Sequence, residues 1–116
     1  MATIAVAQVL HENGIEVATW TNLANASSDV GAKAMLAKHT TRTAQAVGTN
    51  GTTVAIQGSN DGTNWNTLGA GVTLTIGATG SSPVTNLPEN ALYLRPATPS
   101  AASDTDVVIV GGGGGR

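Results

Sequence analysis

The stretch VAIQGSNDGTNWNTL, residues 54–68, predicts two antiparallel strands joined by a tight turn. Val54 and Ile56 alternate with smaller or polar residues, which is the period of a strand with one buried face. The Asn-Asp-Gly run that follows favours a turn in which Gly62 takes a positive φ angle. We therefore expect a type I turn at residues 59–62 and a second strand directly after it.

The same cluster of Asn, Asp, Gly and Thr also resembles part of a calcium-binding loop. An EF-hand loop needs oxygen ligands at alternating positions and a bidentate Glu at its twelfth position. Only Asp61 is acidic here, and Val72, eleven residues further on, cannot ligate an ion. We therefore favour the turn and expect no metal site.

Short strand-like segments separated by Gly, Pro, Asn and Ser continue along most of the chain. Residues 3–10 and 15–20 alternate in hydrophobicity and are separated by Asn-Gly, a strong hairpin signal. In the first of these segments Ile4 and Val6 would point to one face, and Val9 to the other. Further strands are expected at residues 41–47, 52–59, 64–68, 72–76, 91–96 and 106–110. Such a series of short strands predicts an all-β sandwich or barrel.

Two segments depart from this simple pattern. Residues 30–39 contain Ala, Lys, Met and Leu, which favour a short helix, whereas a strand at residues 34–36 is the competing interpretation. Residues 107–110, VVIV, are apolar on both faces, so they predict a central strand or a subunit interface.

The composition sets the domain organisation. The 116 residues fit one domain, and we expect an N-terminal arm or first strand at 1–14, a single β-sandwich domain at 15–110 and a flexible Gly-rich tail at 111–116. The chain has no Phe, two Trp and one Tyr, so its core must consist of small side chains that each bury little area. A core of this kind favours an oligomer or docking onto a larger partner.

Charge and cysteine content exclude several functions. Charged residues make up 10% of the chain, against about 25% in typical domains. The net charge of −2 and the scattered basic residues argue against nucleic-acid binding. The absence of Cys excludes disulfides and thiol chemistry. We expect no export signal and no membrane span, because no apolar run approaches 18 residues.

Candidate catalytic groups are sparse. His11 and His39 are the only histidines, and their spacing to the acids forms no known motif, so we expect both to be exposed. No nucleophile elbow, phosphate-binding loop or dinucleotide fingerprint is present. We therefore expect a protein that is not an enzyme and has no catalytic residue and no cofactor.

The few aromatic residues allow two interpretations. Trp20, Trp65 and Tyr93 could form a platform on which sugars stack, or they could be the large fillers of a core or interface. We favour the second interpretation. Arg95, at the end of a strand before a proline, is expected to form a structural or intersubunit salt bridge.

Four elements of the chain resemble a family of small virion proteins of tailed bacteriophages. The family pattern has a Trp-x-Asn-Leu element, a Gly-Ser-Asn-Asp-Gly-Thr-Asn-Trp element, an aromatic-Leu-Arg-Pro element and a closing acidic, apolar strand. Its matching segments in this chain are residues 20–23, 58–65, 93–96 and 104–110. The first loop departs from the pattern, because it reads NASSD and is followed by an Ala- and Lys-rich insert.

The resemblance implies a capsid decoration, or cement, protein. Such proteins bind the major capsid protein on the outer shell as homotrimers, and the low basicity of this chain agrees with an outer rather than a DNA-facing location. We therefore expect a jelly-roll-like antiparallel β-sandwich that is made in the host bacterial cytoplasm and becomes part of the virion. Its partners would be the major capsid protein and two further copies of itself, without nucleic acid or membrane.

Several residues are expected to form the interfaces of this assembly. The N-terminal arm at residues 2–10 would exchange strands with a neighbour or lie on the shell, and residues 107–110 would form the trimer core. The full set of expected interface residues is Ile4, Val6, Val9, Trp20, Trp65, Tyr93, Arg95, Val107, Val108 and Ile109. The alternatives are a glycan- or receptor-binding module of a phage fibre and a structural subunit of the tail.

Overall fold

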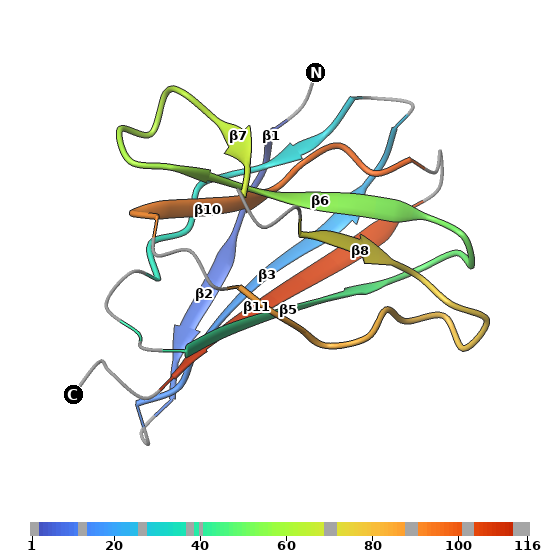
Figure 1. Cartoon of the computed structure of the whole chain (residues 1–116), viewed down its shortest axis with the longest axis horizontal. Helices are drawn as coiled ribbons and strands as arrows, with labels where there is room; N and C mark the ends of the chain where they lie inside the picture. Colours follow the sequence, from blue (N-terminus) through green and yellow to red (C-terminus); the bar gives the residue numbers. More distant parts are fainter. Residues whose placement is uncertain are drawn as a thin grey trace.

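The structure is a computed structural model that describes residues 3–11, 14–25, 28–36, 39, 41–68, 72–87, 91–100 and 104–112. Within these residues the chain forms eleven strands and no helix (Figure 1). Their bounds are β1 Thr3–Ile4, β2 Ala7–Leu10, β3 Glu16–Leu23, β4 Val30–Gly31, β5 Thr41–Val47, β6 Thr53–Ser59, β7 Asn66–Thr67, β8 Thr73–Thr75, β9 Thr85–Asn86, β10 Tyr93–Pro96 and β11 Thr105–Gly112.

One layer of the molecule is a five-stranded antiparallel sheet in the order β2-β3-β11-β5-β9. Strand β11, which is apolar on both faces from Val107 to Val110, lies at its centre and pairs along most of its length with β3 and β5. The expected central strand at residues 106–110 is therefore confirmed. Strand β2 pairs with β3 in the register Val9 to Val17, as the predicted first hairpin requires.

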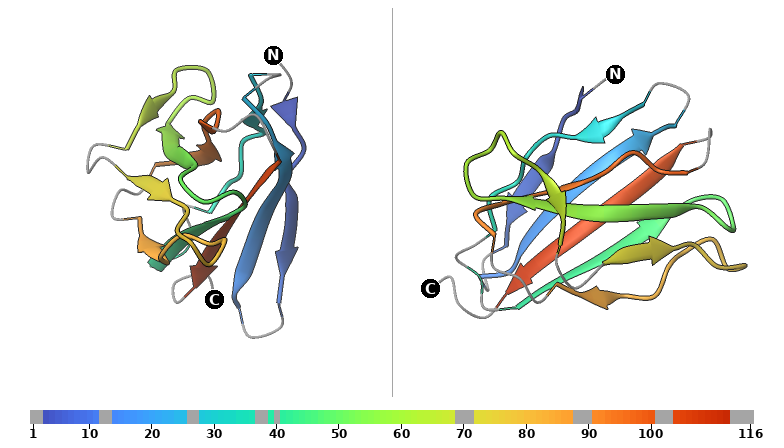
Figure 2. Two further views of the ribbon diagram at one scale, coloured as in Figure 1. Left: turned by 90° about the vertical axis from the view of Figure 1, so that its right-hand side faces the viewer. Right: turned by 45° about the horizontal axis from the view of Figure 1, so that its top comes forward.

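The second layer is a four-stranded sheet around β6. Strand β10 pairs with one edge of β6, while β7 and β8 pair with successive parts of its other edge. Strands β1 and β4 form a short parallel pair beside these sheets. Figure 2 shows the two main layers facing one another. The predicted class, an all-β, jelly-roll-like antiparallel sandwich, is thus confirmed.

The core between the layers follows from the period of two in the sequence. Val54 and Ile56 of β6 are buried, as are Val107 and Ile109 of β11, because successive side chains of a strand point to opposite faces. The largest buried side chain is Trp20, whose indole Nε1 donates a 2.8 Å hydrogen bond to the carbonyl of Ala32. This bond satisfies the one polar atom of a ring that is otherwise packed among aliphatic groups.

The helix expected at residues 30–39 is wrong for the described part of that segment. Val30 and Gly31 form β4, and Ala34 makes an isolated antiparallel bridge with Leu94 of β10. Residues 37, 38 and 40 lie outside the described residues. The extended conformation is favoured over a helix because Ala34 and Leu36 are buried in the sandwich core and Ala34 exchanges backbone hydrogen bonds with Leu94 of β10.

The ends of the domain also differ from the expectation. Gly111 and Gly112 belong to β11 and pair with Arg42 and Thr41, so the expected tail at 111–116 begins at least two residues too early. Residues 113–116 lie outside the described residues. At the other end, β1 pairs with β4 and β2 pairs with β3 of the same chain. In this structure the N-terminal segment is therefore part of the sandwich.

Candidate binding surfaces

The two most specific sequence elements, residues 58–65 and 93–96, lie side by side in the four-stranded sheet. Strand β10 pairs with β6 in the register Tyr93 to Ser59 and Arg95 to Gln57. The turn after β6 is tied to the start of β10, because the backbone N–H of Leu92 donates a 3.1 Å hydrogen bond to Oδ1 of Asn60. The fold thus combines both elements into one surface.

The turn itself is built around Asp61. Its Oδ1 accepts hydrogen bonds from the backbone N–H groups of Thr63 and Asn64, both at 2.8 Å, and from the hydroxyl of Ser59 at 2.9 Å. Its Oδ2 accepts a 2.6 Å bond from the side-chain amide of Asn64. The backbone bonds from Asn64 and Thr63 hold the pKa of this carboxyl well below its usual range. Gly62 has a φ angle of +77°, and β6 and β7 pair antiparallel, so the predicted hairpin is confirmed.

Two cations lie over aromatic rings beside this turn. The guanidinium of Arg95 lies 4.3 Å from the centre of the Trp65 ring, and its Nε donates a 2.9 Å hydrogen bond to Oε1 of Gln57. The ammonium of Lys33 lies 4.7 Å from the centre of the Tyr93 ring. Distances below about 6 Å to a ring face define a cation–π contact.

Gly62, at the tip of the turn, lies next to Lys33 and Tyr93. A methyl group at Gly62 would lie 3.2 Å from Nζ of Lys33 and 3.3 Å from Cε2 of Tyr93, so the backbone of the turn packs directly against both side chains. We call this region the cation–aromatic surface. It comprises Lys33, Gln57, Gly62, Trp65, Tyr93 and Arg95.

The outer face of the five-stranded sheet is a second candidate surface. Cα partners in antiparallel strands place their side chains on the same face, and two such rows cross four strands without a charged residue. We call this region the valine face. Its rows are Val9, Val17, Val110 and Thr43, and Ala7, Thr19, Val108 and Gln45.

A shallow hollow lies on the valine face. It has a volume of about 80 Å³ and is lined by Thr43, Ala44, Gln45, Val84, Val108 and Val110. Val84 is 62% exposed and Val9 is 53% exposed, so apolar side chains lie open to solvent both at the hollow and at the edge strand. Exposed apolar side chains that are contiguous are typical of protein interaction sites.

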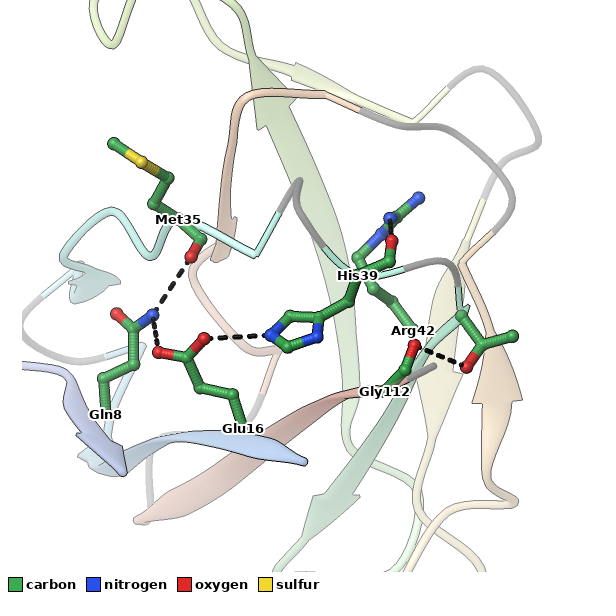
Figure 3. Close-up of polar contacts among 7 residues, drawn as sticks. Gln8, Glu16, Met35, His39, Arg42 and Gly112 are labelled. Carbon is green, nitrogen blue, oxygen red and sulfur yellow. Dashed lines mark hydrogen bonds and ion pairs between the residues drawn. The ribbon is translucent and has the colours of Figure 1, made fainter. Parts of the chain in front are cut away.

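A polar network, buried at His39 and exposed at Gln8, joins β2, β3 and the segment before β5 (Figure 3). Oε1 of Glu16 lies 2.9 Å from Nε2 of His39, and its Oε2 accepts a 2.8 Å bond from Nε2 of Gln8. The same Gln8 nitrogen donates to the carbonyl of Met35 at 3.1 Å, and Nη1 of Arg42 donates to the carbonyl of His39 at 2.7 Å. The network connects the edge strand to the body of the sandwich.

The expected exposure of the histidines is confirmed for His11 and wrong for His39, which is 2% exposed. His39 packs against the backbone of β11, since a methyl group at Gly111 would lie 2.6 Å from its Cδ2. Glu16 was missed as its partner. The signal was the inward face of β3, on which Glu16 shares the period of Ala18 and Trp20.

The residues expected at interfaces fall into three groups. Trp20, Val107 and Ile109 have 0% exposure in the core of their own chain, so their assignment to an interface is wrong. This burial also excludes a sugar-stacking platform made of all three aromatic residues. Ile4 and Val6 are partly buried and pack against the core.

The remaining expected residues lie on the two surfaces. Val9 and Val108 belong to the valine face, and Trp65, Tyr93 and Arg95 belong to the cation–aromatic surface. Arg95 contacts a ring and an amide rather than the carboxylate that a salt bridge would require. Lys33 and Gln57 were missed, because neither the cross-strand register nor the path of residues 30–36 was known.

Among the residues that the structure describes, no three His, Asp or Glu side chains come together as a metal-binding group. The described residues also include no helix that is long and apolar enough to cross a membrane.

No protein-family model matches the chain, and no curated protein is similar to it. Solved structures with weak similarity include a Neisseria meningitidis protein at 9% identity and a TM-score of 0.44, covering 93% of this chain and 82% of that one. An oxalate oxidase is 11% identical with a TM-score of 0.47, over 90% of this chain and 48% of its own. The C-terminal CBM6 of LamC from Zobellia galactanivorans is 9% identical with a TM-score of 0.39, over 91% and 87% of the two chains. These similarities are too weak to transfer any property.

Proposed function

We propose that this chain is a non-catalytic structural protein of a tailed-bacteriophage virion, a decoration protein that binds the outer capsid shell as a homotrimer. The observation that carries the proposal is the valine face, an uncharged and partly apolar sheet surface with a hollow between β11, β5 and Val84. The capsid as binding partner and the trimeric state are inferred from the sequence resemblance. The fold brings two elements of that resemblance together in one sheet.

The valine face suits subunit association because its burial removes no charged side chain of its two rows from water. Its two rows contain Val, Ala, Thr and Gln, and the apolar members lose contact with water when a second protein covers them. Asp106, two residues before Val108 in the same strand, accepts a 3.0 Å bond from the backbone N–H of Asn22. Burial of the valine face therefore leaves that carboxylate at the rim.

The mechanism of stabilisation would be mass action. A protein that binds the assembled shell, and not its free subunits, lowers the free energy of the assembled state by RT ln(1 + [L]/Kd) for each site. A trimer that engages several sites at once multiplies this effect without any new contact. No bond is made or broken, so this function needs no catalytic group.

Native mass spectrometry of the Val84→Glu variant tests the association surface. Val84 is 62% exposed and lines the hollow, so a carboxylate there leaves the core intact and places a charge in the proposed interface. The matched control is Met35→Glu, because Met35 is 52% exposed and is not part of the valine face. We expect the wild type and Met35→Glu to be trimers and Val84→Glu to dissociate.

Two results would contradict the proposal. A wild-type chain that is monomeric at all concentrations, and that does not bind empty capsids, would overturn the function. A Val84→Glu variant that remains trimeric would remove the valine face from the subunit interface. Circular dichroism of each variant establishes that the β-sandwich is still folded.

A further inference from the structure

We propose that the cation–aromatic surface is a docking site for an acidic protein segment, in which two carboxylate side chains pair with Arg95 and Lys33. This inference goes beyond the proposed function and does not depend on it. It states which kind of partner the cation–aromatic surface would bind, a point that the sequence resemblance leaves undefined.

The first argument is that the two cations are held in place without an acid. Arg95 is fixed by the Trp65 ring and by Gln57, and Lys33 lies over Tyr93. Among the residues that the structure describes, neither cation forms an ion pair with a carboxylate. Partial burial lowers the pKa of Arg95, as expected for a cation that has lost water without gaining a counter-ion.

The nearest acid in the hairpin cannot fill this role. Asp61 directs both carboxylate oxygens into its own turn, where they accept bonds from Ser59, Thr63 and Asn64. Loss of those bonds would open the turn that packs against Lys33 and Tyr93. A carboxylate from another molecule is therefore the group that this surface lacks.

The second argument is the spacing of the two cation–aromatic contacts, of which one is made by Tyr93 and the other by Arg95 of β10. Tyr93 and Arg95 are two residues apart on one face of a strand, which places their side chains about 7 Å apart. An extended peptide repeats its own side chains on one face at the same interval. A segment with acidic residues at alternate positions therefore matches the two sites, and its side chains have a free approach because Lys33 is exposed.

A neutral glycan fits the surface less well. Sugars stack on open aromatic faces, but a cation already covers one face of the Trp65 ring and one face of the Tyr93 ring. An ammonium or guanidinium that lies over a ring is instead free to pair with an anion at its outer side. The charge of the surface thus favours carboxylates over hydroxyl groups.

The test is an NMR titration of the isotope-labelled full chain with a capped Glu-Ser-Glu tripeptide. We expect saturable shifts of the Trp65 indole N–H and Arg95 Nε–H signals, with binding that weakens as salt is added. The capped Gln-Ser-Gln tripeptide has the same shape without charge and should produce no such shifts. A neutral disaccharide, titrated in parallel, distinguishes the glycan alternative.

Matched variants separate a defined site from general electrostatics. Arg95→Gln and Lys33→Gln should each weaken Glu-Ser-Glu binding by about two- to fivefold, the size expected for a partly exposed ion pair. Arg116→Gln removes the same charge at the end of the chain and should leave binding unchanged. The proposal is overturned if the acidic tripeptide produces no saturable shift, if Arg116→Gln weakens binding as much as Arg95→Gln, or if only the disaccharide binds. Because the probe is free in solution, these outcomes are independent of any capsid binding.

Discussion

Nε2 of His39 lies 2.9 Å from Oε1 of Glu16, and both side chains are almost completely buried although 23 residues separate them. Gln8 donates to the second carboxylate oxygen, so one acid from β3 joins the edge strand to the segment before β5. Buried polar groups cost free energy when they lose their partners. The pair should therefore contribute to stability although no catalytic role is assigned to it.

The Glu16→Ala substitution tests this contribution. It leaves a buried imidazole nitrogen without its partner, and it should lower the free energy of unfolding by about 1–3 kcal/mol, measured by urea denaturation. Gln8→Ala removes only the exposed end of the network, so we expect a loss below about 1 kcal/mol. Equal losses for both variants would show that the buried pair is not the important contact.

The close packing of His39 on Gly111 leads to a second prediction. A methyl group at Gly111 would lie 2.6 Å from the imidazole, so Gly111→Ala should destabilise the protein by roughly 1–3 kcal/mol. At Gly112 the nearest atom would be 3.7 Å away, and Gly112→Ala is the matched control with a small effect. In a double-mutant cycle, His39→Ala should relieve most of the cost of Gly111→Ala. Additive effects of the two substitutions would contradict this contact.

The turn at Gly62 supports a third prediction, with Gly51 as its control. Both residues have positive φ angles, +77° and +89°, and an alanine at either position is strained by about 1 kcal/mol. Only at Gly62 would the new methyl group also press on Lys33 and Tyr93. We therefore expect a lower melting temperature for Gly62→Ala than for Gly51→Ala. Equal melting temperatures for the two variants would refute the packing of the turn on Tyr93.

A fourth prediction concerns the pH dependence of the Asp61 turn. Hydrogen bonds to the ionised form hold the pKa of Asp61 in the folded chain below its ordinary value of 3.8. Its contribution to stability is therefore fully present above pH 3.8 and is lost as the pH falls below that value towards the folded-state pKa. Asp61→Ala should lower the urea midpoint at neutral pH, and its difference from the wild type should shrink in acid.

Asp104→Ala provides the control for this experiment. Asp104 is exposed, and its side chain makes no hydrogen bond within the described part of the chain. We expect its removal to leave the urea midpoint nearly unchanged over the same pH range. A gap between wild type and Asp61→Ala that stays constant from neutral to acidic pH would contradict the role of the ionised carboxylate.

Local patterns in the sequence were enough to predict most of the strands. The alternation of Val54 and Ile56, and the Asn-Asp-Gly run, define the hairpin because strand period and turn chemistry act over a few neighbouring residues. Strand β5 was predicted with the bounds that the structure has, Thr41–Val47. The short strands β4 and β9 were missed, because two-residue pairings depend on a neighbour that is distant in the sequence.

The candidate surfaces were less predictable for the same reason. Val107, Val108 and Ile109 are equally apolar, and only the packing of the sheets decides which of them face the core. Lys33 reaches Tyr93 because its segment runs beside β10 as an extended chain, whereas the composition of residues 30–39 allowed a helix. The sequence shows the chemistry of each side chain, but which side chains lie together on a surface depends on the register of the strand pairs.

Cosedimentation of the labelled chain with empty tailed-phage capsids that lack a decoration protein tests the proposed function most directly. The wild type should bind saturably and raise the temperature at which the shells disassemble, as expected for a ligand that binds only the assembled state. Val84→Glu should bind much more weakly because we expect it not to trimerise, whereas Met35→Glu should bind like the wild type. A wild-type chain that stays in the supernatant and leaves shell disassembly unchanged would contradict the assignment as a capsid decoration protein.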